Sequence, residues 1–95
     1  MPKYVSLIGW TEQGVQNYKD TVARADAAKK VASDLGASLE ILWTLGEYDL
    51  VVVSEFKDDE TATAFLLSLA QQGNLRSKTM RAFDEGEMQA IISRT

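Results

Sequence analysis

The stretch "ASLEILWTLGEYDLVVVSEF", residues 37–56, decides the fold. Apolar and polar residues alternate over 37–43, and a second strand-like run, 49–56, follows after a few intervening residues. Alternation with a period of two is typical of a strand with one buried face, and two such runs joined by a short loop indicate an antiparallel hairpin. We therefore predict a hairpin with its loop at residues 45–48.

Helices are predicted on both sides of this hairpin. Small or apolar residues recur at helical spacing over 22–36, and Gly36 suits the position just after a helix C-terminus. After the hairpin, residues 60–72 carry one apolar stripe and follow an N-capping residue, either Asp58 or Asp59. The stripe of the first helix is formed by Val22, Ala25, Ala28, Ala32 and Leu35.

Two further strands complete the pattern, at residues 3–10 and 74–83. The resulting order, β-α-β-β-α-β-α, contains two split βαβ units with right-handed crossovers. We therefore predict an α+β, ferredoxin-like sandwich with one antiparallel four-stranded sheet in the order 4-1-3-2. The chain of 95 residues is expected to form one domain spanning residues 1–95.

Two shorter helical segments flank this framework. The first, residues 12–18, begins after the N-cap Thr11, and it either bends into the helix that follows or stands as a separate piece. The last helix, residues 85–93, is preceded by Asp84 and has Glu87 at the position that completes a capping box.

The two faces of the hairpin differ in polarity. With Trp43 opposite Leu50, strand alternation places one wholly apolar set beneath the helices. That set is Leu39, Ile41, Trp43, Leu50, Val52 and Phe56. The other set is apolar only in its middle and consists of Glu40, Leu42, Thr44, Asp49, Val51, Val53 and Glu55.

A two-layer sandwich leaves this second face, here called the open face, without a cover. An exposed apolar patch of this kind usually marks an interface or a ligand groove. We therefore expect a homo-oligomer, a dimer or higher, that packs sheet against sheet through the open face. The alternative is that the C-terminal segment, with Met88, Ile91 and Ile92, folds back over the face.

Composition excludes several classes of function. The chain has no Cys and no His, which removes thiol nucleophiles, disulfides, His-based triads and the usual zinc or haem ligands. A net charge of −4 argues against nonspecific binding to nucleic acid or anionic lipid. We expect no cofactor, no metal, no nucleic-acid or membrane partner and, because no signal or spanning segment is apparent, a cytoplasmic location.

A small-molecule site is predicted at one end of the sheet. In this topology strand 1 ends where strands 3 and 4 begin, so the ligand-binding candidates Trp10, Tyr48, Asp49 and Arg76 gather there. Asp49, if an oligomer encloses it, is also a candidate catalytic base. The favoured alternative is a structural Asp49–Arg76 bridge with two rim aromatics. The full group is Gly9, Trp10, Thr11, Glu47, Tyr48, Asp49, Asn74 and Arg76.

Other charged groups have simpler explanations. The acidic runs at 58–60 and 84–87 open helices, where they complement the helix dipole, so neither predicts a metal site. Among the basic residues of the last strand, Arg76 and Lys78 share one face and Arg81 lies on the other, so they form no nucleic-acid stripe.

Three stretches, "WTEQGVQNYKD" (10–20), "WTLGEYDLVVV" (43–53) and "GNLRSKTMRAF" (73–83), resemble the GYD domain family. The name comes from a Gly-x-Tyr-Asp type of motif, here residues 46–49. The chain departs from the family at 21–22, Thr-Val, near which a proline is common. The resemblance implies a dimeric α/β-barrel but no established catalytic residue. Proteins that share this fold have different activities, so the fold alone predicts no function for this chain.

Three functions fit these observations. The main interpretation is a homo-oligomeric, non-catalytic small-molecule-binding domain with a cavity at the sheet face near Asp49. The second is a cofactor-independent oxygenase or isomerase acting on an aromatic or quinone-like substrate, with Trp10, Tyr48 and Asp49 lining the pocket. The third is a structural assembly subunit whose sheet face is filled by side chains.

Overall fold

The computed structural model describes all residues, 1–95, and its elements follow the predicted order. No helix in it has the length and apolar character needed to cross a membrane. The elements are β1 (Lys3–Trp10), α1 (Glu12–Gln16), the 3₁₀ turn η1 (Tyr18–Asp20), α2 (Thr21–Asp34), β2 (Ser38–Trp43), β3 (Leu50–Glu55), α3 (Asp59–Gln71), β4 (Leu75–Ala82) and α4 (Glu85–Ile92).

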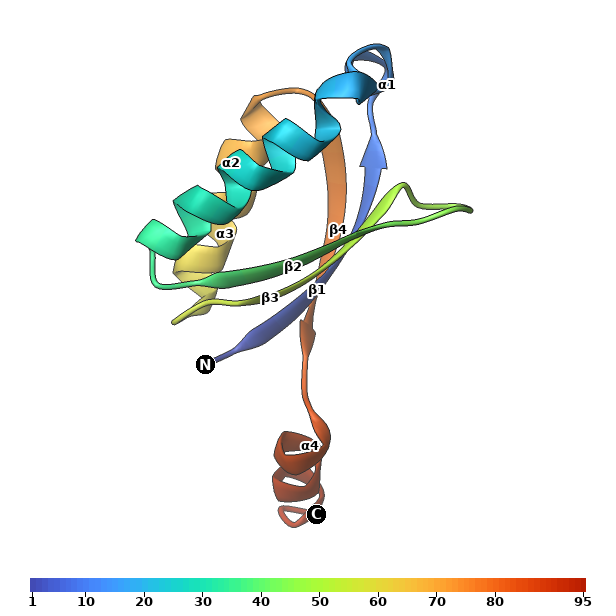
Figure 1. Cartoon of the computed structure of the whole chain (residues 1–95). Coiled ribbons are helices and arrows are strands. Elements are labelled where there is room, and N and C mark those ends of the chain that lie inside the picture. Colours follow the sequence, from blue (N-terminus) through green and yellow to red (C-terminus); the bar gives the residue numbers. More distant parts are fainter.

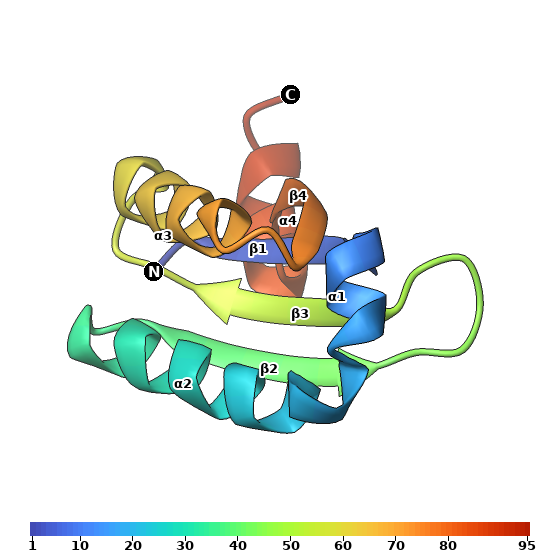
Figure 2. The same cartoon turned by 90° about the horizontal axis from the view of Figure 1, so that it is seen from above.

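The four strands form one antiparallel sheet in the order β2-β3-β1-β4, which confirms the predicted topology. Helices α2 and α3 lie over the same face of this open sheet but apart from each other, α2 against β2 and α3 against β4 (Figures 1 and 2). Helix α4 instead projects beyond the end of β4, away from the other helices (Figure 1). The arrangement is a ferredoxin-like fold with an additional C-terminal helix.

The hairpin has the predicted register. Trp43 pairs with Leu50, and the backbone N–H of Thr44 donates to the carbonyl oxygen of Asp49 at 2.9 Å. The Thr44 hydroxyl donates to the carbonyl of Tyr48 at 2.6 Å, which closes the loop. Gly46 has a φ of +141°, a backbone conformation that residues with a Cβ rarely adopt, so this loop position requires glycine.

The first helical region is divided into two α-helices joined by η1. Thr11 caps α1 as predicted, accepting a hydrogen bond from the backbone N–H of Gly14. Asp20 precedes α2, but its side chain makes no capping hydrogen bond. At the other end of α2, Gly36 has a φ of +73° and the Ala37 N–H donates to Ala32 at 2.8 Å, which ends the helix as predicted.

Acidic side chains begin the last two helices. Asp58 accepts from the backbone N–H of Thr61, and hydrogen bonding from the Thr61 side chain, together with this N–H, holds the pKa of Asp58 below its ordinary value. Asp84 and Glu87 form the predicted capping box at α4. Lys3 pairs with Glu55 and with Asp84, both at 3.3 Å, and these contacts raise the pKa of Lys3. The backbone N–H of Glu87, and after it Lys3, lowers the pKa of Asp84.

The core lies between the helices and the sheet face predicted to meet them. Phe56 is 2% exposed and contacts the rings of Tyr4 and Phe65, with centroid distances of 6.1 and 5.3 Å. The Tyr4 hydroxyl donates to Asp59; burial and this hydrogen bond raise the pKa of Tyr4 to about 12. Only 12 of the 95 residues are buried, so the single chain encloses a small core.

Candidate functional site

The sheet end predicted to hold a site is assembled from β1, β4 and the loop before β3. Gly9 pairs with Arg76 across the β1–β4 ladder. The backbone N–H of Thr11 donates to the carbonyl of Asn74 at 3.1 Å. On the opposite edge of β1, the backbone N–H of Trp10 donates to Asp49 at 2.8 Å. The topology therefore brings these segments together, as predicted.

Asp49 serves the backbone at this end of the sheet. The ladder between β1 and β3 ends at the Ile8–Leu50 pair, which leaves the N–H of Trp10 without a strand partner. The Asp49 carboxylate accepts that N–H, while its own backbone N–H donates to Ile8 at 2.9 Å. The predicted Asp49–Arg76 bridge is absent, because both ion pairs in the structure belong to Lys3.

Substitutions at Asp49 separate this backbone role from a role for its charge. Asp49→Ala leaves the half-buried Trp10 N–H unpaired and is expected to lower the free energy of unfolding by about 1–2 kcal/mol. Asp49→Asn keeps an oxygen that accepts the same N–H, and it is expected to cost less than about 1 kcal/mol. Urea denaturation of the three proteins measures the difference. Equal losses in both variants would show that the charge, not the acceptor oxygen, is what matters.

The four predicted ligand-binding residues do not share one side of the sheet. Tyr48 lies in the loop, as predicted, and its ring centroid is 5.9 Å from the Nζ atom of Lys78, a residue of the open face. Trp10 instead packs with Ile8 and Leu50 beneath the helices. The sheet therefore separates the Trp10 ring from Tyr48 and Arg76, so these side chains cannot line one pocket within a single chain.

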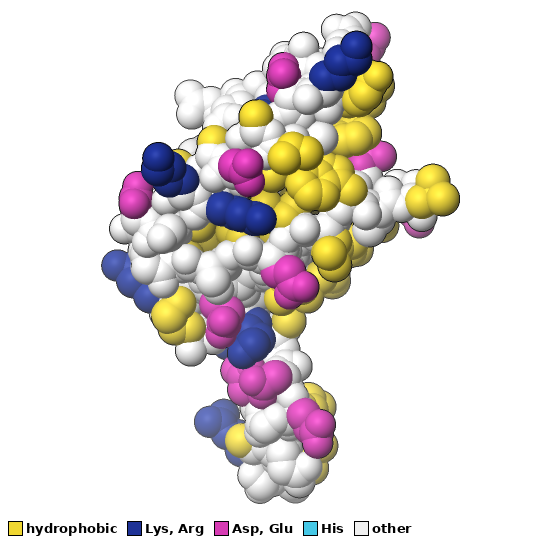
Figure 3. Space-filling view, viewed as in Figure 1, with side chains coloured by type: hydrophobic (Ala, Val, Ile, Leu, Met, Phe, Trp, Pro, Cys, Tyr) yellow, Lys and Arg dark blue, Asp and Glu magenta, His cyan; other side chains and the backbone are white.

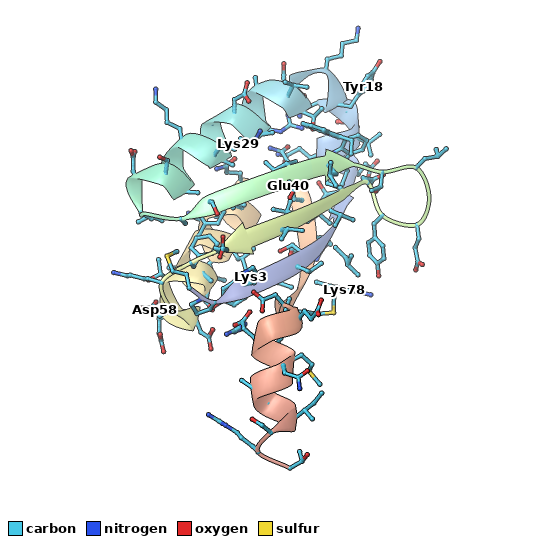
Figure 4. All side chains as sticks on the ribbon, turned by 60° about the horizontal axis from the view of Figure 1, so that its bottom comes forward. Lys3, Tyr18, Lys29, Glu40, Asp58 and Lys78 are labelled. Carbon is cyan, nitrogen blue, oxygen red and sulfur yellow. The ribbon has the colours of Figure 1, made fainter.

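The open face has the predicted polarity. The strand register places Glu40, Val53, Val5 and Met80 next to one another in a row that crosses the four strands. Figure 4 labels three residues of this face, Lys3, Glu40 and Lys78. The next row runs through Leu42, Val51, Leu7 and Lys78. The middle of the face is therefore apolar, and at its edges Leu42 and Met80 are about half exposed, at 52% and 49%.

Helix α4 does not cover this face. It stands apart at the far end of β4, and none of its residues is buried (Figure 1). Met88 and Ile92 are 47% and 51% exposed. Figure 3 shows hydrophobic side chains at the surface beside α2 and again on the projecting α4. The alternative in which the C-terminal segment folds back over the sheet is therefore wrong for the single chain.

A mostly apolar cavity lies on the other side of the sheet, between α2 and α3. It holds about 70 Å³ and opens to solvent, with β1 and β3 as its floor. Its apolar lining includes Phe56, Phe65 and Leu69. None of the four predicted ligand-binding residues lines it. The prediction of a cavity near Asp49 is thus unsupported within one chain, and the cavity observed was missed.

One sequence signal pointed to this cavity. Ser6, Ser54 and Thr79 occupy strand positions whose side chains face the helices, where a closed core has apolar residues. Ser6 and Ser54 are 3% and 5% exposed, and the hydroxyls of Ser6 and Thr79 lie 2.9 Å apart. Small, polar floor residues opposite the alanines of α2 leave space that larger apolar side chains would have filled.

The titratable groups that line this cleft are Tyr4 and Arg24. Burial and the hydrogen bond to Asp59 raise the pKa of Tyr4 to about 12, and the guanidinium of Arg24 has hydrogen-bond donors but no acceptor. The Arg24 Nη1 donates to the carbonyl of Asn17 at 3.0 Å, whereas its Nη2 is buried without a hydrogen-bond partner. Both groups donate hydrogen bonds at neutral pH and neither accepts a proton, which suits binding better than general-base chemistry.

Comparisons with known proteins agree with this fold. The sequence model of the GYD domain matches residues 4–92. A crystal structure of TTHA0845 from Thermus thermophilus is similar, with 26% sequence identity and a TM-score of 0.57. The match covers 88% of this chain and 95% of that one. No curated protein matches the chain.

Proposed function

This chain belongs to the GYD domain family, and from that fold and its exposed surfaces we propose that it is a self-associating, small-molecule-binding domain. Copies associate through the open face of the sheet. The observation that carries this proposal is the apolar middle of that face, formed by Val5, Leu7, Val51 and Val53, which nothing in the chain covers. An uncovered apolar patch on a small domain is typical of an interface.

The C-terminal helix supports association independently. Helix α4 has eight residues, and isolated helices shorter than about 12–15 residues are only marginally stable in water. It nevertheless carries Met88, Ile91 and Ile92 and buries none of its residues in its own chain. A second copy beside the sheet offers the apolar surface that this helix lacks.

The cleft between α2 and α3 supports the binding half of the proposal. It is mostly apolar with a few polar groups, the usual composition of a small-molecule site. The oxygenase or isomerase alternative relied on Trp10, Tyr48 and Asp49 acting together. Trp10 lies on the opposite side of the sheet from Tyr48, and Asp49 is engaged by a backbone N–H, so the geometry favours binding over catalysis.

Sedimentation velocity tests the association. The wild-type protein is expected to sediment as a dimer or larger oligomer at micromolar concentration. Val53→Glu places a carboxylate in the middle of the open face, where burial without a partner is costly, so the dissociation constant should rise by about a hundredfold or more. Leu67→Glu is the matched control, because Leu67 lies on α3 with 66% of its surface exposed.

The two variants also decide which surface is used. Circular dichroism confirms that each variant is folded before its mass is measured. A monomeric wild-type protein at high micromolar concentration would refute the association. Dissociation by Leu67→Glu with an intact Val53→Glu oligomer would move the interface to the helix layer and reject the open face.

A further inference from the structure

The cleft between α2 and α3 has two chemically different ends. Helix α2 begins, and α3 ends, at the edge of the sheet where β1 ends and β4 begins (Figure 2). The helix and loop residues that line this end are polar, Thr21, Arg24, Gln72 and Asn74, and they lie beside the apolar strand residues Leu50 and Leu75. At the opposite end, where β3 leads into α3, the lining residues are mainly apolar, Phe56, Ala62 and Phe65, and the hydroxyl of Tyr4 there already donates to Asp59. A ligand that fits both ends has one polar group and one hydrocarbon part.

The charge that the ligand's polar group carries can be inferred from Arg24. Arg24 is the single charged residue in the lining, and neither ion pair of the structure involves it. Its Nη1 is satisfied by the carbonyl of Asn17, but its Nη2 is buried without a partner. An unpaired buried donor on a cation is unfavourable, and a carboxylate oxygen supplies a strong, charge-assisted acceptor.

The size of the cleft limits the hydrocarbon part. A cleft volume of about 70 Å³ admits a short hydrocarbon chain, and the remainder of the ligand lies toward the opening to solvent. Small residues on α2, Ala25 and Ala28, and the serines of the sheet floor border this space. One guanidinium in mostly apolar surroundings balances one negative charge, so a monoanion suits the cleft better than a phosphate or a dicarboxylate.

We propose that the cleft between α2 and α3 binds a monocarboxylate with a short hydrocarbon tail, its carboxylate paired with Arg24 and its tail directed toward Phe56. This inference rests on the small-molecule-binding half of the proposed function and is independent of self-association. Arg24 acts as the anchoring residue that selects an anion. The aromatic and alanine side chains at the far end accept the tail.

Titrations of the ¹⁵N-labelled wild-type protein with hexanoate, hexan-1-ol and hexylamine test the proposal by NMR. The three probes share a tail and differ in charge. Hexanoate is expected to give saturable shifts at the backbone amides of Ala25, Ala28 and Ser54. Hexan-1-ol should bind at least about tenfold more weakly than hexanoate, because it lacks the charge-assisted contact with Arg24. Hexylamine should bind more weakly still, because its positive charge is repelled by Arg24.

Variants of Arg24 make the test specific. Arg24→Gln should weaken hexanoate binding about tenfold or more and leave the affinity for hexan-1-ol unchanged. Arg24→Lys keeps the charge and should retain part of the affinity. Arg94→Gln is the matched control, because Arg94 is exposed at the C-terminus, and it should bind hexanoate as the wild type does.

The outcomes separate this inference from the broader proposal. Equal affinities of the wild type for hexanoate and hexan-1-ol would show that the cleft does not select a carboxylate. An unchanged affinity of Arg24→Gln for hexanoate would show the same. In either case the cleft would remain a binding site for apolar ligands. Hexanoate shifts confined to Val5, Leu7 and Val51 would place the ligand on the open face and reject the cleft. Absence of binding by all three probes would reject both the inference and the small-molecule-binding half of the proposed function.

Discussion

Phe56→Ala is expected to lower the free energy of unfolding by about 3–5 kcal/mol. Phe56 is 2% exposed and packs against the rings of Tyr4 and Phe65, which belong to β1 and α3. Removing its ring therefore opens a cavity where the sheet and a helix meet. Since small domains typically have only about 5–15 kcal/mol of stability, this loss is a large part of the total.

Urea denaturation followed by circular dichroism measures the effect. All variants are compared at one protein concentration, because self-association adds to apparent stability through mass action. Leu67→Ala is the matched control: it removes an apolar side chain that is 66% exposed on α3, and alanine favours helix. It should change stability by less than about 0.5 kcal/mol. If Phe56→Ala were no more damaging than this control, the core would not be centred on Phe56.

Gly14→Ala is expected to cost about 3 kcal/mol, the second-largest effect. Gly14 lies in α1 directly against the chain that enters β4, and a Cβ at this position would come within 2.1 Å of the carbonyl oxygen of Asn74. That carbonyl accepts the backbone N–H of Thr11 at 3.1 Å, so relieving the clash also disturbs the bond that joins α1 to β4. The atoms nearest to the added Cβ are backbone atoms of Asn74, so no flexible side chain can move to relieve the clash.

Gly86→Ala provides the matched glycine control. Gly86 is exposed in the first turn of α4, and the nearest atom to an added Cβ, a carboxylate oxygen of Asp84, is 3.6 Å away. Because alanine has the higher helix propensity, this variant should be neutral or slightly stabilising. Thermal denaturation of both variants tests the pair. A Gly14→Ala protein that melts with the wild type would mean that α1 shifts without cost.

The local pattern of the hairpin was sufficient to predict its structure. Alternation in 37–43 and 49–56 predicted the Trp43–Leu50 register and the face that meets the helices. The side-chain period of a strand is two, so a slip of one residue would have exposed Leu50 and Phe56 and buried Asp49 and Glu55. This strong penalty is why sequence alone determines the register here.

The candidate site was predictable only in part. Sequence order and topology correctly brought the end of β1, the loop before β3 and the start of β4 together. The hydrogen bond from the Trp10 N–H to Asp49 was not predicted. It forms because the pairing of β1 with β3 ends at Leu50 and leaves that N–H without a strand partner. Where two strands stop pairing depends on their arrangement in space, which the sequence does not show. The gathering of Asp49 and Arg76 at one end of the sheet suggested a salt bridge, but the Asp49 carboxylate instead accepts the backbone N–H of Trp10.

By itself, the sequence determined the order of the elements, the sheet topology, the hairpin register and the helix ends at Asp58, Asp84 and Gly36. Each of these follows from interactions between residues close in the chain or from a period that one segment displays. Only the tertiary structure decided the gap between α2 and α3, the isolation of the Arg24 Nη2 and the direction of α4 away from the sheet. These features depend on distances between elements remote in sequence, which packing of the whole chain sets and no local pattern encodes.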